Sequence, residues 1–387
     1  MDWQFELVGI PAPPFGEQAR AAWLAGRFSE ARLRNVQTDG AGNVVGLLLP
    51  SNAAPESTGA VVVLSAHLDT VFPAETPLHP RLTETDGIGF LQAPGACDNA
   101  AGVVGMLALA HALVQSKFEP PVPLVFLGNV GEEGEGDLRG VRFFYSQGAF
   151  AGRVAAHIVL DGAGADSAVT QALASRRFVV RITGPGGHSF TDAGTPNPIA
   201  AIASALATLA QTPLPDEPRT TLNLGTIQGG TSVNSIPESA TASVDIRSAS
   251  SEQILRLEVA LHRVAEDAVD HCNSGAAAYP TRSRGPLRFE IEKIGDRPAG
   301  NLAGDSPLLE SLRAVDRHLG LKTDLRIGST DANLPLSLGI PAISIGAGGE
   351  GGGAHTQAEW FSAKERELGL KRVLLLTLAM LDWAAGQ

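Results

Sequence analysis

Histidine and carboxylate side chains recur in this sequence where predicted β-strands end. The apolar strand segments 61–66, 124–130 and 158–160 are each followed by such side chains, and a further aspartate begins a predicted helix after residues 95–97. The residues concerned are His67, Asp69, Asp98, Glu132, Glu133 and Asp161. Because the carboxyl ends of parallel strands face one crevice of an open sheet, we expect these groups to converge there.

Metal binding is the most economical explanation for such a cluster. Carboxylates packed together repel one another strongly unless cations neutralise them. Imidazole and carboxylate ligands without thiolates suit zinc, and also cobalt or manganese. The alternative is that these are solvated polar residues at loop tips, where most His, Asp and Glu side chains occur. The number and order of the groups favour the metal site.

The elements that must position this cluster alternate between short apolar segments and longer helical ones. Strands are predicted at 43–49, 61–66, 123–129, 157–161 and 342–346. Helices are predicted at 16–29, 98–115, 136–147, 306–319 and 363–384. This alternation is typical of an α/β fold, with a doubly wound, mostly parallel sheet covered by helices on both faces.

The pattern changes between residues 173 and 295. Strands are expected at 178–183, 221–228, 240–247 and 288–294, and helices at 198–212 and 251–272. This βαββαβ order matches a ferredoxin-like α+β module, whose two ends emerge close together and allow insertion into a host domain. We therefore expect a host domain formed by residues 1–172 plus 296–387, with an inserted lid or dimerisation domain at 173–295.

Charge and apolar patterning argue against several classes of protein. With 29 Lys and Arg residues against 41 Asp and Glu residues, the chain has a net charge of -12 and should repel nucleic acid and anionic lipid. No segment offers the roughly eighteen consecutive apolar residues of a membrane span. Residues 1–6 are acidic where a secretory signal would be basic, and Cys97 and Cys272 lie far apart. We expect a cytoplasmic protein without nucleic-acid or membrane partners.

Short motifs along nearly the whole chain resemble one enzyme family. They are Ala-His-Leu-Asp-Thr-Val at 66–71, Ala-Cys-Asp-Asn-Ala-Ala-Gly at 96–102, Gly-Glu-Glu-Gly at 131–134, Gly-Pro-Gly-Gly-His-Ser at 184–189, 229–237, Gly-Ser-Thr-Asp at 328–331 and Gly-Ala-His-Thr at 353–356. Their order resembles the co-catalytic dizinc metallopeptidases, which include peptidase T, carboxypeptidase G, aminoacylase and acetylornithine deacetylase or succinyl-diaminopimelate desuccinylase. Peptidase T-like members are the most similar.

The resemblance implies a role for each matching residue. It places His67 and Asp161 on one metal ion, Glu133 and His355 on the other, and Asp98 between the two. Glu132 would be the general base that takes a proton from a water or hydroxide held between the ions. Asp69 lies two residues beyond His67, so on a continuing strand it would point to the same side and orient the imidazole. The peptide bond after Asp98 is expected to be cis.

The inserted domain carries further expected site residues. The resemblance implies that His188 stabilises the oxyanion, often across a dimer, so a homodimer is expected. Asn234 and Arg247 match positions that hold the backbone or carboxylate of the substrate. From the residues alone, His188 could be a loop histidine without a role, Asn234 could shape a turn, and Arg247 could pair with a surface carboxylate. Asp161 could likewise cap a turn.

The favoured function is metal-dependent hydrolysis of an amide bond in a small peptide, by a di- or tripeptide aminopeptidase or other exopeptidase. The segment 296–300 and the aspartate at position 161 favour the peptidase T side. Removal of the acyl group from an N-acyl amino acid by the same machinery is the main alternative. A non-catalytic metal-binding scaffold and a lid-less aminopeptidase are more remote. The physiological substrate stays open.

Overall fold

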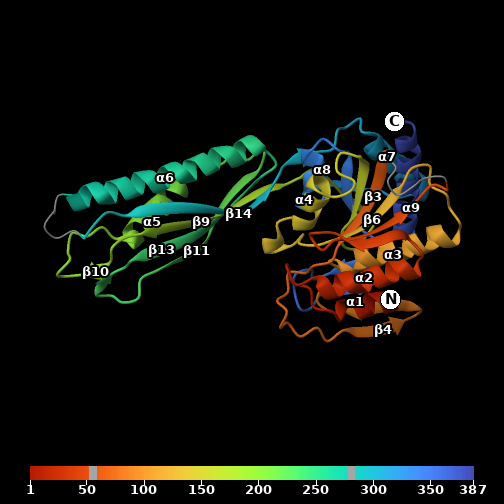
Figure 1. Cartoon of the computed structure of the whole chain (residues 1–387), viewed down its shortest axis with the longest axis horizontal. Coiled ribbons are helices and arrows are strands. Elements are labelled where there is room, and N and C mark those ends of the chain that lie inside the picture. The colour runs from red at the N-terminus through yellow and green to blue at the C-terminus, as the bar shows by residue number, and fades with distance from the viewer. Residues whose placement is uncertain (52–58, 278–283) are drawn as a thin grey trace. The chain divides into compact units, whose positions relative to one another are not determined.

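The computed structural model describes residues 1–51, 59–277 and 284–387, which form two compact units. One unit comprises Met1–Ala172 and Gly300–Gln387, and the other comprises Leu173–Ala299 (Figure 1). The second junction lies four residues beyond the expected boundary at 295, because strand β14 (Arg288–Arg297) continues through that position.

A large sheet, parallel at its centre, forms the scaffold of the first unit. Its strand order is β1-β2-β6-β3-β7-β17-β8-β15, with β16 paired to β8. Strands β6, β3, β7 and β17 run parallel, and the pairs β1–β2, β2–β6 and β17–β8 are antiparallel. The strands are β1 (Arg34–Thr38), β2 (Val44–Leu48), β3 (Val61–His67), β6 (Leu124–Asn129), β7 (Val154–Leu160), β8 (Ser167–Ala172), β15 (Gly300–Asn301), β16 (Asp324–Gly328) and β17 (Ala342–Ile345).

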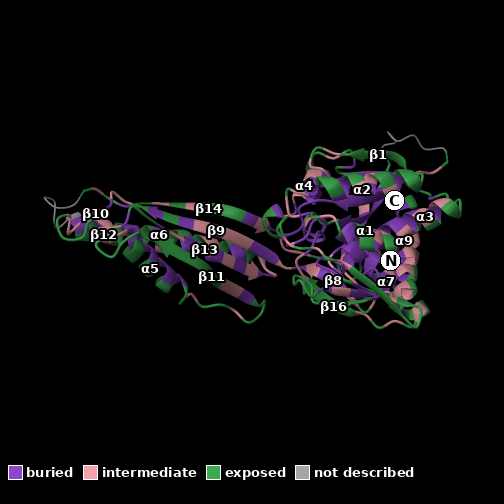
Figure 2. Ribbon diagram, turned by 90° about the horizontal axis from the view of Figure 1, so that it is seen from below, coloured by how far each residue is buried: buried purple, intermediate pink, exposed green. Residues whose placement is uncertain are grey.

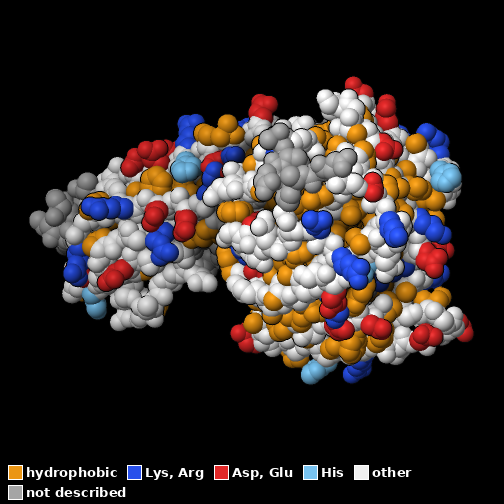
Figure 3. All heavy atoms as spheres, turned by 45° about the vertical axis from the view of Figure 1, so that its right-hand side comes forward, with side chains coloured by type: hydrophobic (Ala, Val, Ile, Leu, Met, Phe, Trp, Pro, Cys, Tyr) orange, Lys and Arg blue, Asp and Glu red, His pale blue; other side chains and the backbone are white. Residues whose placement is uncertain are grey.

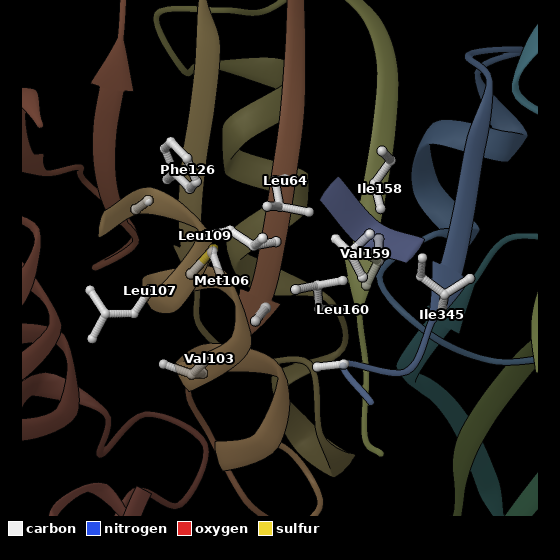
Figure 4. Packing of buried hydrophobic residues seen from close by; sticks show 14 of the residues in the cluster. Leu64, Val103, Met106, Leu107, Leu109, Phe126, Ile158, Val159, Leu160 and Ile345 are labelled. Carbon is white, nitrogen blue, oxygen red and sulfur yellow. The ribbon is translucent and has the colours of Figure 1, made fainter. Parts of the chain in front are cut away.

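Both faces of this sheet are buried, as the apolar sequence of its central strands requires. Along β3, Val62 and Leu64 belong to one hydrophobic cluster, whereas Val61 and Val63 belong to another on the opposite face. Figure 4 shows Leu64 near Leu109 and other side chains of the first cluster. The first cluster includes residues of α1 (Asp2–Val8), α2 (Gln18–Glu30), α3 (Ala100–Gln115), α7 (Pro307–Leu319) and α9 (Arg366–Ala385), and the second includes residues of α4 (Arg139–Ser146). Helix α8 (Asn333–Ser337) contributes Leu336 to the first cluster and packs Leu334 against the second. The doubly wound α/β prediction is confirmed.

A small antiparallel sheet of the first unit was not predicted. Its order is β18-β19-β5-β4, formed by Arg81–Thr85 (β4), Ile88–Gln92 (β5), Glu350–Gly352 (β18) and Trp360–Ser362 (β19). These strands are short and partly exposed, so they lack the apolar segments that reveal the central strands. The sheet brings segments about 270 residues apart in the chain side by side, since Trp360 pairs with Gln92.

The second unit has the βαββαβ order. Its antiparallel sheet has the order β11-β13-β9-β14, visible in Figure 2, and is formed by Ala174–Thr183 (β9), Thr220–Gly229 (β11), Ser239–Ser248 (β13) and β14. Helices α5 (Pro198–Leu209) and α6 (Ser251–Ala277) pack on one face, where Phe178, Val180 and Ile182 are buried. Two short strands, β10 (Gly187–His188) and β12 (Ser235–Ile236), pair outside this sheet.

The described surface mixes both signs of charge. On the face shown in Figure 3, basic and acidic side chains are interspersed among apolar ones, without a continuous basic surface. Within residues 1–51, 59–277 and 284–387, no helix is both long enough and apolar enough to cross a membrane.

His157 gives the fold a measurable dependence on pH. The side chain is fully buried in β7, where its ring nitrogens lie 2.8 Å from the Ser65 hydroxyl and 2.8 Å from the Tyr145 hydroxyl. Burial lowers the pKa of His157 from 6.5 to about 3. The folded state therefore holds the neutral ring, and its stabilising contribution is complete above pH 6.5 and declines as the pH falls toward 3.

We expect the free energy of unfolding to fall below pH 6.5 by up to about 1.4 kcal/mol per pH unit from this one group. Urea unfolding between pH 7.5 and pH 5, compared for the wild type and His157→Gln at equal metal content, measures the effect. The variant should show a shallower dependence on pH, because it has lost one titrating group. Identical slopes for both proteins would contradict the assignment.

Candidate metal centre

The predicted ligands of the first unit lie at the carboxyl ends of three neighbouring parallel strands. His67 is the last residue of β3, Glu132 and Glu133 follow β6, and Asp161 follows β7. The backbone keeps these ends in register, since the Leu68 N–H donates to the Asn129 carbonyl at 2.7 Å. The topology thus brings together groups that are far apart in sequence.

Among the residues that the structure describes, three overlapping groups of side chains each offer ligand atoms that lie within 4.8 Å of one another. The groups are His67 with Asp98 and Asp161, Asp98 with Glu133 and His355, and His67 with Glu132 and Glu133. Asp98 Oδ1 is 3.0 Å from His67 Nε2, and Asp98 Oδ2 is 3.1 Å from His355 Nε2. The two oxygens of one carboxylate therefore face two different imidazoles, as expected of a residue shared by two cation positions.

The electrostatics of the bare cluster show how strongly it needs positive charge. Burial and the nearby charge of Glu132 raise the pKa of Glu133 to about 8. A hydrogen bond with Asp98 raises the pKa of His355 to about 9. Burial alone would lower the pKa of His67, but the carboxylates of Asp69 and Asp98 raise it well above its ordinary value. These shifts favour protonation of the cluster, so a bound cation would compete with protons for it.

The donor set fits a divalent cation. Asp98 Oδ1 is buried and has no hydrogen-bond partner within the described part of the chain, although it lies 3.0 Å from the His67 ring. A buried carboxylate oxygen left in this condition is costly unless a cation or proton satisfies it. The described ligand atoms are imidazole nitrogens and carboxylate oxygens, which suit zinc, cobalt or manganese.

Hydrogen bonds of the neighbouring residue Asn99 hold the segment that carries Asp98 in place. The bond between the two residues is cis, as the motif resemblance implies. The Asn99 side chain caps α3 by accepting from the Gly102 N–H, and it donates to the Leu160 carbonyl at 2.9 Å. A Cβ at Gly102 would lie 2.2 Å from Asn99 Oδ1, so glycine is required there. The Asp98 segment is thereby tied to the strand end before Asp161.

The Asp69 carboxylate lies near the His67 ring, as expected, but its hydrogen bonds go to a further group. The His67 Nδ1 atom lies 3.1 Å from the Asp69 backbone carbonyl but 3.7 Å from its carboxylate. The carboxylate instead accepts from the backbone N–H groups of Glu132 at 3.0 Å and Glu133 at 2.7 Å. The prediction assumed that the strand continues to Asp69, whereas β3 ends at His67 and the side-chain alternation ends with it.

Asp331 is a buried acid that the sequence analysis quoted within a motif but gave no role. Its carboxylate accepts from Asn129 Nδ2 at 2.7 Å, while Oδ1 has no hydrogen-bond partner among residues 1–51, 59–277 and 284–387. Burial and the charge of Glu132 raise its pKa to about 8. The sequence offered a signal for its partner: Asn129 is a polar residue at the end of the apolar strand β6, as the predicted ligands are at the ends of theirs.

The three remaining predicted residues belong to the second unit. His188 is exposed in β10, and its Nδ1 accepts from the Phe190 N–H at 3.2 Å. It lines a cavity of about 910 Å³ together with Arg181, Thr231 and Arg284. Asn234 accepts from the Ser232 hydroxyl. Arg247 pairs with Asp245 at 2.7 Å, which is the surface pairing considered as its alternative role.

Residues 63–379 match the profile of Peptidase family M20/M25/M40. The chain is 31% identical over 254 residues to a probable carboxypeptidase of Neosartorya fischeri, covering 62% of this chain and 56% of that protein. It is 26% identical over 280 residues to a probable carboxypeptidase of Aspergillus flavus, covering 67% and 63%. The matches thus span only 56% to 63% of the length of these curated relatives.

Solved structures share the fold over nearly the whole chain. An aminopeptidase PepT from Bacillus cereus has a TM-score of 0.74 at 19% identity, covering 97% of this chain and 96% of that one. A tripeptidase from Staphylococcus aureus has a TM-score of 0.74 at 22% identity, covering 100% and 98%. A dinuclear metal-binding peptidase from Bacillus subtilis has a TM-score of 0.67 at 18% identity, covering 98% and 97%.

The shared position of Asp98 predicts two different outcomes of ligand removal. Asp98→Ala removes an oxygen from both groups that contain it, so we expect both ions to be lost on dialysis. Asp161→Ala removes a ligand from one group, so one ion should be retained. Elemental analysis of the dialysed proteins measures the metal content per chain.

The exposed carboxylate of Asp166 provides the matched control, since Asp166→Ala should keep the metal content of the wild type. Equal metal loss in Asp98→Ala and Asp161→Ala would count against a shared ligand.

Proposed function

This chain belongs to Peptidase family M20/M25/M40, and we propose that it is an exopeptidase that hydrolyses amide bonds in small peptides. It would use two divalent metal ions, with zinc as the leading candidate. The observation that carries the proposal is the pair of ligand groups joined by Asp98, with the buried Glu132 beside them. The names of the similar aminopeptidase, tripeptidase and carboxypeptidases support a small-peptide substrate.

Each of the two ligand groups would bind one metal ion. His67 and Asp161 would bind one ion, Glu133 and His355 the other, and Asp98 both. When bound, the ions would lower the pKa of a water molecule and polarise the scissile carbonyl. The Asp69 carboxylate accepts from the backbone N–H groups of Glu132 and Glu133, so the backbone from which both side chains extend is fixed.

Glu132 is the proposed general base. Its side chain is almost fully buried, and its carboxylate oxygen lies within 4.8 Å of ligand atoms of His67 and Glu133. A carboxylate there can accept a proton from the attacking water and pass it to the departing amine.

The second unit supplies the proposed substrate contacts. As a lid, it would present His188 to the developing oxyanion, and a donor of this kind contributes roughly 3 to 4 kcal/mol in comparable hydrolases. Asn234 and Arg247 would hold the backbone or carboxylate of the substrate. The exposure of His188 leaves its ring available to the site of a second copy.

We propose a homodimer through this unit. Strand β11 is an edge strand of its sheet and carries the exposed apolar side chains Leu224 and Ile227. An edge strand presents unpaired N–H and C=O groups, so a second copy could pair with it and cover those side chains.

A panel of di- and tripeptides tests the proposed activity. The peptides should include versions with a blocked amino or carboxyl end, assayed with zinc, manganese and cobalt. We expect turnover of short unblocked peptides and strong loss when one end is blocked, which identifies the end that the site recognises. Faster hydrolysis of acetylated amino acids than of every peptide would favour the deacylase, and no cleavage at all would contradict the proposal.

Glu132→Gln should keep both metal ions and lower kcat by about 10² to 10⁴-fold, because the amide cannot accept the proton. Steady-state kinetics and elemental analysis of the same preparation measure the two properties. The exposed Glu135 of the same loop gives the control variant Glu135→Gln, which should behave as the wild type. Full activity of Glu132→Gln would remove it as the base.

A further inference from the structure

Glu359 is a fully buried carboxylate next to the proposed metal centre that has no role in the mechanism above. It lies directly before β19 and has no exposed surface. Its Oε2 atom accepts from the Gly95 N–H at 2.8 Å, and its Oε1 atom accepts from the N–H groups of Cys97 and Asp98 at 2.7 Å each. One side chain thus holds the backbone on which the shared ligand Asp98 stands.

The backbone of Glu359 belongs to the turn that carries the ligand His355. The Glu359 N–H donates to the Thr356 carbonyl at 3.2 Å, and the Thr356 N–H donates to the Gly353 carbonyl at 3.0 Å. The Glu359 carbonyl in turn accepts from the Ala93 N–H at 3.0 Å. Glu359 therefore connects the segment 93–98 with the segment 353–359 through both its side chain and its main chain.

Burial and the nearby Asp98 raise the pKa of the Glu359 carboxyl, although its hydrogen bonds to the backbone oppose this shift. Arg20 is also buried, and its guanidinium group donates to the carbonyls of Ile10 at 2.8 Å and Leu68 at 3.0 Å. Its positive charge is attracted by the carboxylates of Asp69 and Glu359. A buried carboxylate is costly unless it is paired and hydrogen-bonded. If position 359 only had to fill space in the core, an uncharged side chain would be more stable there, so the carboxylate itself must have a function.

We propose that Glu359 is a positioning residue, which fixes Asp98 and His355 relative to each other and thereby sets the affinity of the site for its pair of metal ions. The proposal rests on the metal centre of the proposed function. Charge-assisted hydrogen bonds to three backbone groups fix the position of Asp98 more tightly than neutral ones would. Asp98 can then present its two oxygens toward the two histidines at the same time.

The test is Glu359→Gln in the full-length protein. The amide has the same shape but one acceptor oxygen, so at least one backbone N–H must lose its partner. We expect zinc affinity, measured by competition with a chelator, to fall about 10- to 100-fold. We also expect kcat to fall with little change in KM, and hydrogen exchange of the amides of residues 95–98 to accelerate.

Two further variants separate positioning from general loss of stability. Asp316→Asn alters another buried carboxylate of the same unit, which pairs with Arg372 at 2.8 Å and lies outside both ligand segments. It should lower the unfolding temperature and leave zinc affinity and exchange at 95–98 unchanged. Glu359→Asp retains the charge and should recover part of the lost affinity.

Wild-type zinc affinity in Glu359→Gln would overturn the proposal. A loss of affinity no larger than that of Asp316→Asn at the same loss of stability would overturn it as well. Zinc affinity and hydrogen exchange are measured without substrate. Failure of the wild type to cleave any peptide would therefore refute the proposed activity and leave the role of Glu359 standing.

Discussion

Mutual repulsion among acidic side chains is the constraint that shapes this site. Asp98, Glu132, Glu133 and Asp161 surround the imidazoles of His67 and His355, and burial together with the charge of Glu132 raises the pKa of Glu133 to about 8. Such crowding persists only where the surrounding fold holds it in place. The rest of the first unit can be understood as the means of holding these charges together.

Two buried carboxylates do much of that holding through the backbone. Asp69 accepts from the N–H groups of Glu132 and Glu133, and Glu359 accepts from those of Gly95, Cys97 and Asp98. The buried Arg20 is attracted by both carboxylates. The segments that carry Asp98 and Glu132–Glu133 are therefore fixed by hydrogen bonds to their main chain, which leave the ligand side chains free to face the cations.

The parallel sheet supplies the frame for these loops. Its central strands are buried on both faces, so β3, β6 and β7 end at defined positions beside one another. The second unit has a separate core, formed by one face of its sheet and two helices, and leaves His188 exposed on short paired strands. Rigid cores with ligand groups on the connecting loops are a common basis for sites of this kind.

The sequence by itself determined the central strands, the main helices and the βαββαβ order, because apolar periodicity is a local property that neighbouring residues carry. It also indicated which His, Asp and Glu residues follow strands, and hence the candidate ligands. Only the tertiary structure decided that Asp69, besides lying near the His67 ring, holds the backbone of Glu132 and Glu133, and that Glu359 joins segments about 260 residues apart. The small sheet that contains β5 and β19 likewise lacked a local signal. These features depend on hydrogen bonds between distant segments, and no local pattern of side chains records which backbone groups will meet.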